Sequence, residues 1–142
     1  MGHRTKETIH RGDGSLAVTK YCYEAMGRST DVIENFVDGG AHDNETNLTT
    51  HTDYDGHGLV AMVTNPRGIK TKYEYDHHNW LVKTTEDFGA TATQLNLVTK
   101  YDRDGDGNVS VLTRIMGTSP DEVTTNQYDA ADNLVCITDA EG

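Results

Sequence analysis

Short stretches of alternating polar and hydrophobic residues run along the whole chain. In residues 71–75, "TKYEY", Thr71, Tyr73 and Tyr75 fall on one face of an extended segment, and residues 19–23, "TKYCY", repeat the pattern. Other stretches, such as "LVAMVT" at 59–64, are apolar on both faces. Turn-forming residues separate these segments, so the pattern predicts an all-β fold made of short strands.

The strand pattern recurs in a fixed register. Four segments open with Tyr-Asp, reach a threonine, and place a glycine four residues after it. The tyrosine-to-threonine distance is 10 residues in three copies and 12 in the third. An earlier copy opens at Tyr23, and residues 8–12 resemble the end of a still earlier one. The repeat-defining positions are Tyr54, Asp55, Thr64, Gly68, Tyr75, Asp76, Thr85, Gly89, Tyr101, Asp102, Thr113, Gly117, Tyr128, Asp129, Thr138 and Gly142. Internal repeats of this kind determine the architecture.

Each copy of the repeat contains the residue types that favour one β-hairpin. The aspartate after the tyrosine is suited to accept a hydrogen bond from the backbone N–H two residues later, which closes an Asx-turn. The fourth residue after each tyrosine tolerates a left-handed backbone: Gly27, Gly58, Asn79, Gly105 and Asp132. We therefore predict consecutive antiparallel β-hairpin repeats in one array over residues 1–142. Its units lie near 8–53, 54–74, 75–100, 101–127 and 128–142, and the polar stretch 39–52 is predicted to be a flexible insertion.

Composition limits the classes of function. Leu, Ile, Val and Phe make up only 26 of 142 residues and the net charge is -11, a balance close to that of disordered chains. Twenty threonines, 11 valines and seven tyrosines support strands instead. The acidic balance argues against nucleic-acid partners and anionic membranes. No apolar run is long enough for membrane insertion, and the N-terminus lacks the apolar region of a signal peptide.

The repeat register resembles the YD repeats of RHS-type proteins. The resemblance covers residues 8–142 and rests on the Tyr-Asp opening, the turn glycine and the threonine-to-glycine close. This family includes bacterial polymorphic toxins, the C component of Tc toxin complexes, and animal teneurins. It implies a curved or spiralling strip of sheet that forms a hollow shell around a toxin or other cargo, in an exported or cell-surface assembly. With four or five units, the chain resembles a segment of such a shell.

Two groups of side chains raise the question of metal binding. Asp102, Asp104 and Asp106 alternate ahead of Gly107, as in many calcium loops, but the twelfth position of a helix–loop–helix site would be Thr113 rather than an acid. A calcium site in a hairpin turn stays open beside the interpretation that these residues only lengthen the turn. His77 and His78 occupy the turn of their own repeat. Adjacent side chains of an extended segment point apart and rarely bind one ion together, so we expect a solvated turn and not a metal site.

The remaining candidate chemistry is sparse. Cys22 and Cys136 stand in no metal or redox spacing, which favours two buried or half-buried thiols over a disulfide. No nucleophile elbow or phosphate-binding glycine loop is present, so we expect no enzyme and no cofactor. We predict a structural shell segment whose partners are further repeats or a second copy. The alternative is a surface module in which the tyrosines bind carbohydrate or a cell-surface receptor.

Overall fold

The computed structural model describes residues 5–10, 16–43, 45–89, 91, 94–115 and 120–139. Within these residues every regular element is a β-strand, as the sequence pattern predicted. No helix that could cross a membrane is found in this part of the chain. The chain divides into two compact units, Met1–Ile69 and Lys70–Gly142, and each is described here by itself.

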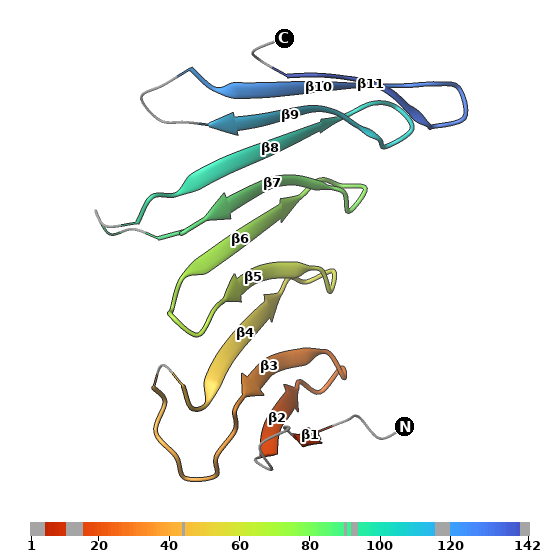
Figure 1. The fold of residues 1–142 in the computed structure, drawn as a ribbon. Helices are drawn as coiled ribbons and strands as arrows, with labels where there is room; N and C mark the ends of the chain where they lie inside the picture. The colour runs from red at the N-terminus through yellow and green to blue at the C-terminus, as the bar shows by residue number, and fades with distance from the viewer. Residues whose placement is uncertain are drawn as a thin grey trace. The chain divides into compact units, whose positions relative to one another are not determined.

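The first unit contains five strands. They are β1 (Lys6–His10), β2 (Leu16–Tyr23), β3 (Ser29–Glu34), β4 (Leu48–Tyr54) and β5 (Val60–Thr64). Within this unit the strands pair in sequence order and in antiparallel fashion, β1 with β2, β2 with β3, β3 with β4 and β4 with β5 (Figure 1). The strands β2/β3 and β4/β5 form two hairpins, and β1 lies against β2.

The second unit contains three hairpins. Its strands are β6 (Lys70–Tyr75), β7 (Leu81–Glu86), β8 (Leu97–Arg103), β9 (Val109–Ile115), β10 (Glu122–Tyr128) and β11 (Leu134–Thr138). They also pair in sequence order and in antiparallel fashion. The predicted fold class, consecutive antiparallel β-hairpins, is therefore confirmed in both units.

Hydrophobic burial is slight in both units. No hydrophobic side chain of the described residues is buried; the buried side chains there are Asn47, Thr84 and Thr85. Within each unit the strands contact only their neighbours in sequence, so among the described residues no second layer of strands covers either face of the sheet. An uncovered sheet leaves its apolar side chains partly in water, which explains why a chain with few large aliphatic residues can form it. Strand pairing and contacts between adjacent hairpins must supply much of the stability.

The segment predicted as a flexible insertion, 39–52, is partly a strand. Leu48–Tyr54 forms β4, which pairs with both β3 and β5, so the prediction is wrong for residues 48–52. The loop before β4 is organised by Asn47, which is only 5% exposed. Its side-chain oxygen accepts the Val37 N–H at 2.9 Å, and its amide group donates to the carbonyls of Val37, Gly40 and Ala41. One side chain thus ties the loop together.

Candidate functional site

The feature that repeats most faithfully is a five-residue turn at the tip of each hairpin. In the turn 55–59 the Asp55 N–H donates to the Leu59 carbonyl at 2.8 Å, and the Gly58 N–H donates to the Asp55 carbonyl at 3.1 Å. Gly58 is left-handed, with φ 87°. This is a three-residue loop in which a left-handed residue follows a tight turn. The Asp55 carboxylate accepts the N–H groups of His57 and Leu59, so the predicted Asx-turn is confirmed.

The same hydrogen bonds recur in the other turns. Asp76, Asp104 and Asp129 each accept two backbone N–H groups, and Asn65 does so between β5 and β6 with its side-chain oxygen. The N–H of Leu59 lowers the pKa of Asp55. In Asp76 and Asp104 desolvation raises the pKa, but the hydrogen bonds from the backbone N–H groups outweigh it, so both pKa values are lowered. The backbone N–H of Asn133 is the main cause of the lowered pKa of Asp129. These carboxylates therefore remain ionised as parts of the turn.

The turn 24–28 is a variant of this arrangement. It has the same backbone hydrogen bonds, and Gly27 is left-handed with φ 82°, as predicted. Glu24 replaces the aspartate, however, and its longer side chain pairs with the Arg28 guanidinium. The turn geometry thus does not depend on a short carboxylate when the left-handed position is suitable.

The third hairpin uses a different register from the one the sequence predicted. The turn begins at Asp104, and Asp102 lies within β8, where its side chain is exposed. The left-handed residue is Gly107, with φ 94°, so the assignment of that role to Gly105 is wrong. Strand β8 is extended by two residues before the turn, and the turn itself keeps its ordinary length. The equivalents of Tyr54 and Asp55 in this hairpin are therefore Arg103 and Asp104.

A side chain just before the turn connects each of three hairpins to the preceding strand. The Tyr54 hydroxyl donates to the Ser29 carbonyl at 2.8 Å, and the Tyr128 hydroxyl donates to the Val109 carbonyl at 3.1 Å. In the third hairpin the Arg103 guanidinium donates to the Leu81 carbonyl at 3.2 Å. Each acceptor is the first residue of the preceding hairpin's return strand. We call this contact the inter-hairpin link.

Cation–π contacts accompany two of the inter-hairpin links. The Arg28 guanidinium lies 4.6 Å from the centre of the Tyr54 ring. In the second unit Arg103 lies 6.0 Å from the centre of the Trp80 ring. Arg28 and Trp80 are each the last residue of a turn, while Tyr54 and Arg103 each precede a turn. The two pairs thus use the same positions with cation and aromatic ring exchanged.

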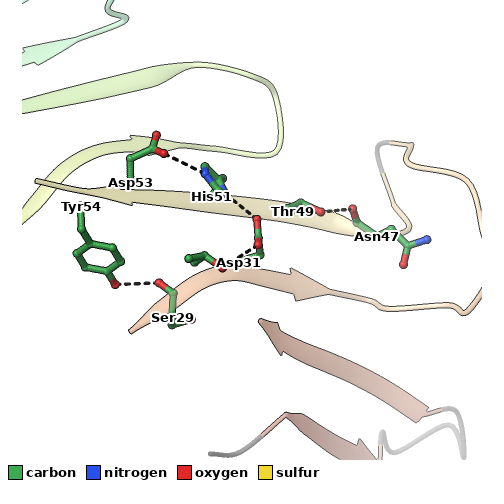
Figure 2. Close-up of polar contacts among 8 residues, drawn as sticks. Ser29, Asp31, Asn47, Thr49, His51, Asp53 and Tyr54 are labelled. Atoms are coloured by element: carbon green, nitrogen blue, oxygen red, sulfur yellow. Dashed lines mark hydrogen bonds and ion pairs between the residues drawn. The ribbon is translucent and has the colours of Figure 1, made fainter. Parts of the chain in front are cut away.

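A polar cluster on β3 and β4 is the other concentration of functional groups (Figure 2). His51 lies directly opposite Asp31, and its Nδ1 is 2.6 Å from an Asp31 oxygen while its Nε2 is 3.2 Å from an Asp53 oxygen. The hydrogen bond with Asp31 raises the pKa of His51, and the bond with Asp53 adds to this against partial desolvation. Both ring nitrogens lie within hydrogen-bond distance of a carboxylate, so the cluster links β3 to β4 and favours the protonated imidazole. Sequence reasoning missed it, because cross-strand register is needed to bring Asp31 to His51.

The repeat-defining residues occupy different places in the hairpins. Tyr54, Tyr75 and Tyr128 end their first strands, whereas Tyr101 lies two residues before the end of β8. The four threonines lie on return strands, and Thr85 is only 5% exposed. Gly68 is left-handed, with φ 78°, in the turn 65–69. Gly89 lies in the connection after β7, and Gly117 and Gly142 lie outside the described residues.

The three aspartates proposed for calcium have separate positions. Asp104 caps the turn, Asp106 is exposed at its tip and Asp102 belongs to β8. One Asp104 oxygen accepts the N–H groups of Asp106 and Asn108 at 3.1 and 2.9 Å. The carboxylate thus has a structural role without an ion. Calcium binding by this set stays a prediction.

The structure differs from two predictions about histidine and cysteine side chains. His77 and His78 are exposed in a turn, as predicted, but their side chains do not point apart: the ring centres are 3.8 Å from each other. Cys136 is exposed and not half-buried, since β11 is exposed along its length. Cys22 is half-buried, and both cysteines are free thiols.

Comparison with known families agrees with this geometry. Residues 54–91 match the model of the RHS Repeat family. The matched segment starts at Tyr54, the first of the four Tyr-Asp openings, and includes the second at Tyr75. No curated protein was found that matches the chain. Residues 54–91 are therefore recognised as a partial segment of the YD/RHS-repeat type.

Proposed function

We propose that this chain is a structural segment of an RHS/YD-repeat β-shell, which helps to enclose a toxin or other cargo domain and has no catalytic activity. The observation that carries the proposal is the inter-hairpin link. Hydroxyl and guanidinium groups join successive hairpins in each unit, while no hydrophobic side chain of the described residues is buried. Such units gain stability by stacking on neighbours, as repeat proteins do.

The surface of β11 supports stacking on a further hairpin. Its side chains are all exposed, with Leu134, Val135 and Ile137 at 49%, 61% and 60%. Within the described residues its backbone pairs with β10 alone. An exposed strand edge with apolar side chains is a template for another strand. A further repeat, or a second copy of this chain, would complete the ladder and cover these side chains.

Sedimentation velocity of the 142-residue chain over a range of concentrations tests the proposal. We expect self-association, because an open edge pairs with itself when no further repeat is supplied. Ile137→Lys places a charge on the edge strand and is expected to reduce association. Met26→Lys is the matched control, because Met26 is 80% exposed in a turn and takes no part in an edge. Association should remain unchanged in the control.

Two results would contradict the shell proposal. One is a wild-type chain that stays folded and monomeric at concentrations of tens of micromolar. The other is equal loss of association in the Ile137→Lys and Met26→Lys variants, which would indicate a general effect of charge. A monomer whose tyrosine fluorescence changes on addition of glycans would support the carbohydrate-binding alternative instead.

A further inference from the structure

The turn 76–80 has a feature that the other described turns lack. The candidate ligand atoms of Asp76, His77 and His78 all lie within 4.8 Å of one another, and no other group of this kind occurs among the residues the structure describes. Both histidines are exposed, so an ion can reach them from solvent. We propose that this turn binds a divalent transition-metal ion such as Zn²⁺ or Cu²⁺ through two imidazoles and one carboxylate. Imidazole nitrogen is a ligand that suits both metals.

The carboxylate of Asp76 is already oriented for this role. One oxygen, Oδ1, accepts the backbone N–H groups of His78 at 2.8 Å and Trp80 at 3.0 Å. The other oxygen, Oδ2, lies 3.8 Å from Nδ1 of His78. The turn thus fixes the carboxylate through one oxygen and directs the other toward the imidazole. Fixing a ligand through hydrogen bonds lowers the entropy lost when an ion binds.

The imidazole of His78 is also constrained. Its ring stacks on Trp80, with centres 4.9 Å apart and an interplanar angle of 29°. Trp80 in turn contacts Arg103 on β8, so the indole is held on a second side. Metal–nitrogen distances of about 2.0–2.1 Å place tetrahedral ligand atoms roughly 3.4 Å apart. The candidate ligand atoms, now within 4.8 Å of one another, must therefore approach by at most about 1.4 Å when an ion binds.

The fluorescence of Trp80 can report metal binding at this turn. It is the only tryptophan of the chain and stacks on a proposed ligand, so Cu²⁺ at this site should quench its fluorescence. We expect saturable quenching by Cu²⁺ in the wild-type protein and its reversal by a chelator such as EDTA, since Zn²⁺ binds nitrogen and oxygen sites more weakly than Cu²⁺ and would not displace it. The variant His77→Ala/His78→Ala should lose the saturable phase. His57→Ala is the matched control, because His57 occupies the tip of the turn 55–59 without a second histidine, and its titration should equal that of the wild type.

Asp76→Asn separates metal binding from turn formation. Asn65 caps an equivalent turn, with its side-chain oxygen 2.9 Å from the Arg67 N–H and 3.0 Å from the Ile69 N–H. Asparagine at position 76 should therefore preserve the turn while removing the charged ligand. We expect Cu²⁺ affinity to fall at least about tenfold, the lower end of the loss seen when even an outer partner of a metal ligand is removed. Far-UV circular dichroism should be unchanged.

The outcomes that overturn the metal site are specific. Equal quenching midpoints for the wild type and His77→Ala/His78→Ala would show that the imidazoles are not ligands. An unchanged midpoint in Asp76→Asn would remove the carboxylate from the site and with it the three-ligand proposal. Reduced affinity in His57→Ala, equal to that in the double variant, would show binding to exposed histidines in general.

Discussion

Replacing Gly107 by alanine, with Gly105→Ala as its partner, tests the register of the third hairpin. The two glycines lie two residues apart in the same turn, "DGDGN", at 104–108, where Gly105 is exposed and Gly107 is half-buried. The sequence pattern placed the left-handed residue at Gly105, and the structure places it at Gly107, with φ 94°. The two assignments predict opposite orders of stability for the two alanine variants.

The structure gives the magnitude of the difference. A residue with a Cβ in the left-handed region costs about 1–2 kcal/mol. The Cβ of an alanine at 107 would also lie 2.7 Å from Cζ2 of Trp80, so the indole must shift. At Gly105 no atom lies within 4 Å of an added Cβ and φ is not left-handed, so alanine should stabilise by about 0.4–1 kcal/mol through the unfolded chain. Together these terms separate the variants by about 1.4–3 kcal/mol.

Urea unfolding followed by Trp80 fluorescence and by far-UV circular dichroism measures this difference. With a slope of about 1–3 kcal/mol per molar urea, the transition midpoints should differ by roughly 1 M, with Gly107→Ala the lower. Two probes are needed because the Gly107 variant displaces the reporting indole. Equal midpoints, or a lower midpoint for Gly105→Ala, would refute the shifted register and restore the assignment made from the tyrosine.

Three further predictions concern the links between strands and the acidic turn. Tyr54→Phe removes the hydrogen bond to the Ser29 carbonyl and should cost about 0.5–1.5 kcal/mol in urea unfolding. Because the pKa of His51 is raised on folding, its stabilisation is present below its ordinary pKa and lost as the pH rises through the folded value. The melting temperatures of wild type and His51→Gln should therefore differ at pH 5.5 and converge by pH 9; the side chain is 43% exposed, so we expect under about 1 kcal/mol. Calcium titration monitored by circular dichroism should distinguish the wild type from Asp104→Ala/Asp106→Ala if the ion binds there, and equal responses would exclude it.

Local chemistry explains why the hairpins could be predicted. The Asp55 turn needs only an acceptor at its first position and a left-handed residue three positions later, and both are visible in the sequence. The same rule applied to residues 104–108 identifies Asp104 and Gly107 as the equivalent pair. The prediction of Gly105 failed because it counted from Tyr101, although the strand before the turn can lengthen without changing the turn.

Contacts between segments explain what could not be predicted. Asn47 organises its loop through groups 6–10 residues away, and His51 meets Asp31 only because the strands pair in one register. No pattern of neighbouring residues in the sequence indicates either of these contacts. The proximity of the His77 and His78 rings was also missed: both residues were placed in a turn, but the side-chain directions of an extended segment were applied to them. Each of these errors concerns where side chains go after the backbone has turned or paired.

The two cation–π pairs have the cation and the aromatic ring at opposite positions, which shows that the repeat keeps the contact and not the residue type. Trp80 and Arg103 in the second unit occupy the positions that Arg28 and Tyr54 occupy in the first: the last residue of one turn and the residue just before the next. Arg103 also donates to the Leu81 carbonyl, as Tyr54 does to that of Ser29, so the link persists when the tyrosine has moved two residues away. A repeat identified by its tyrosines alone therefore misplaces the third hairpin. The position of a residue relative to the turn decides which side chains come into contact. Different pairs of a cation and an aromatic ring can occupy these positions.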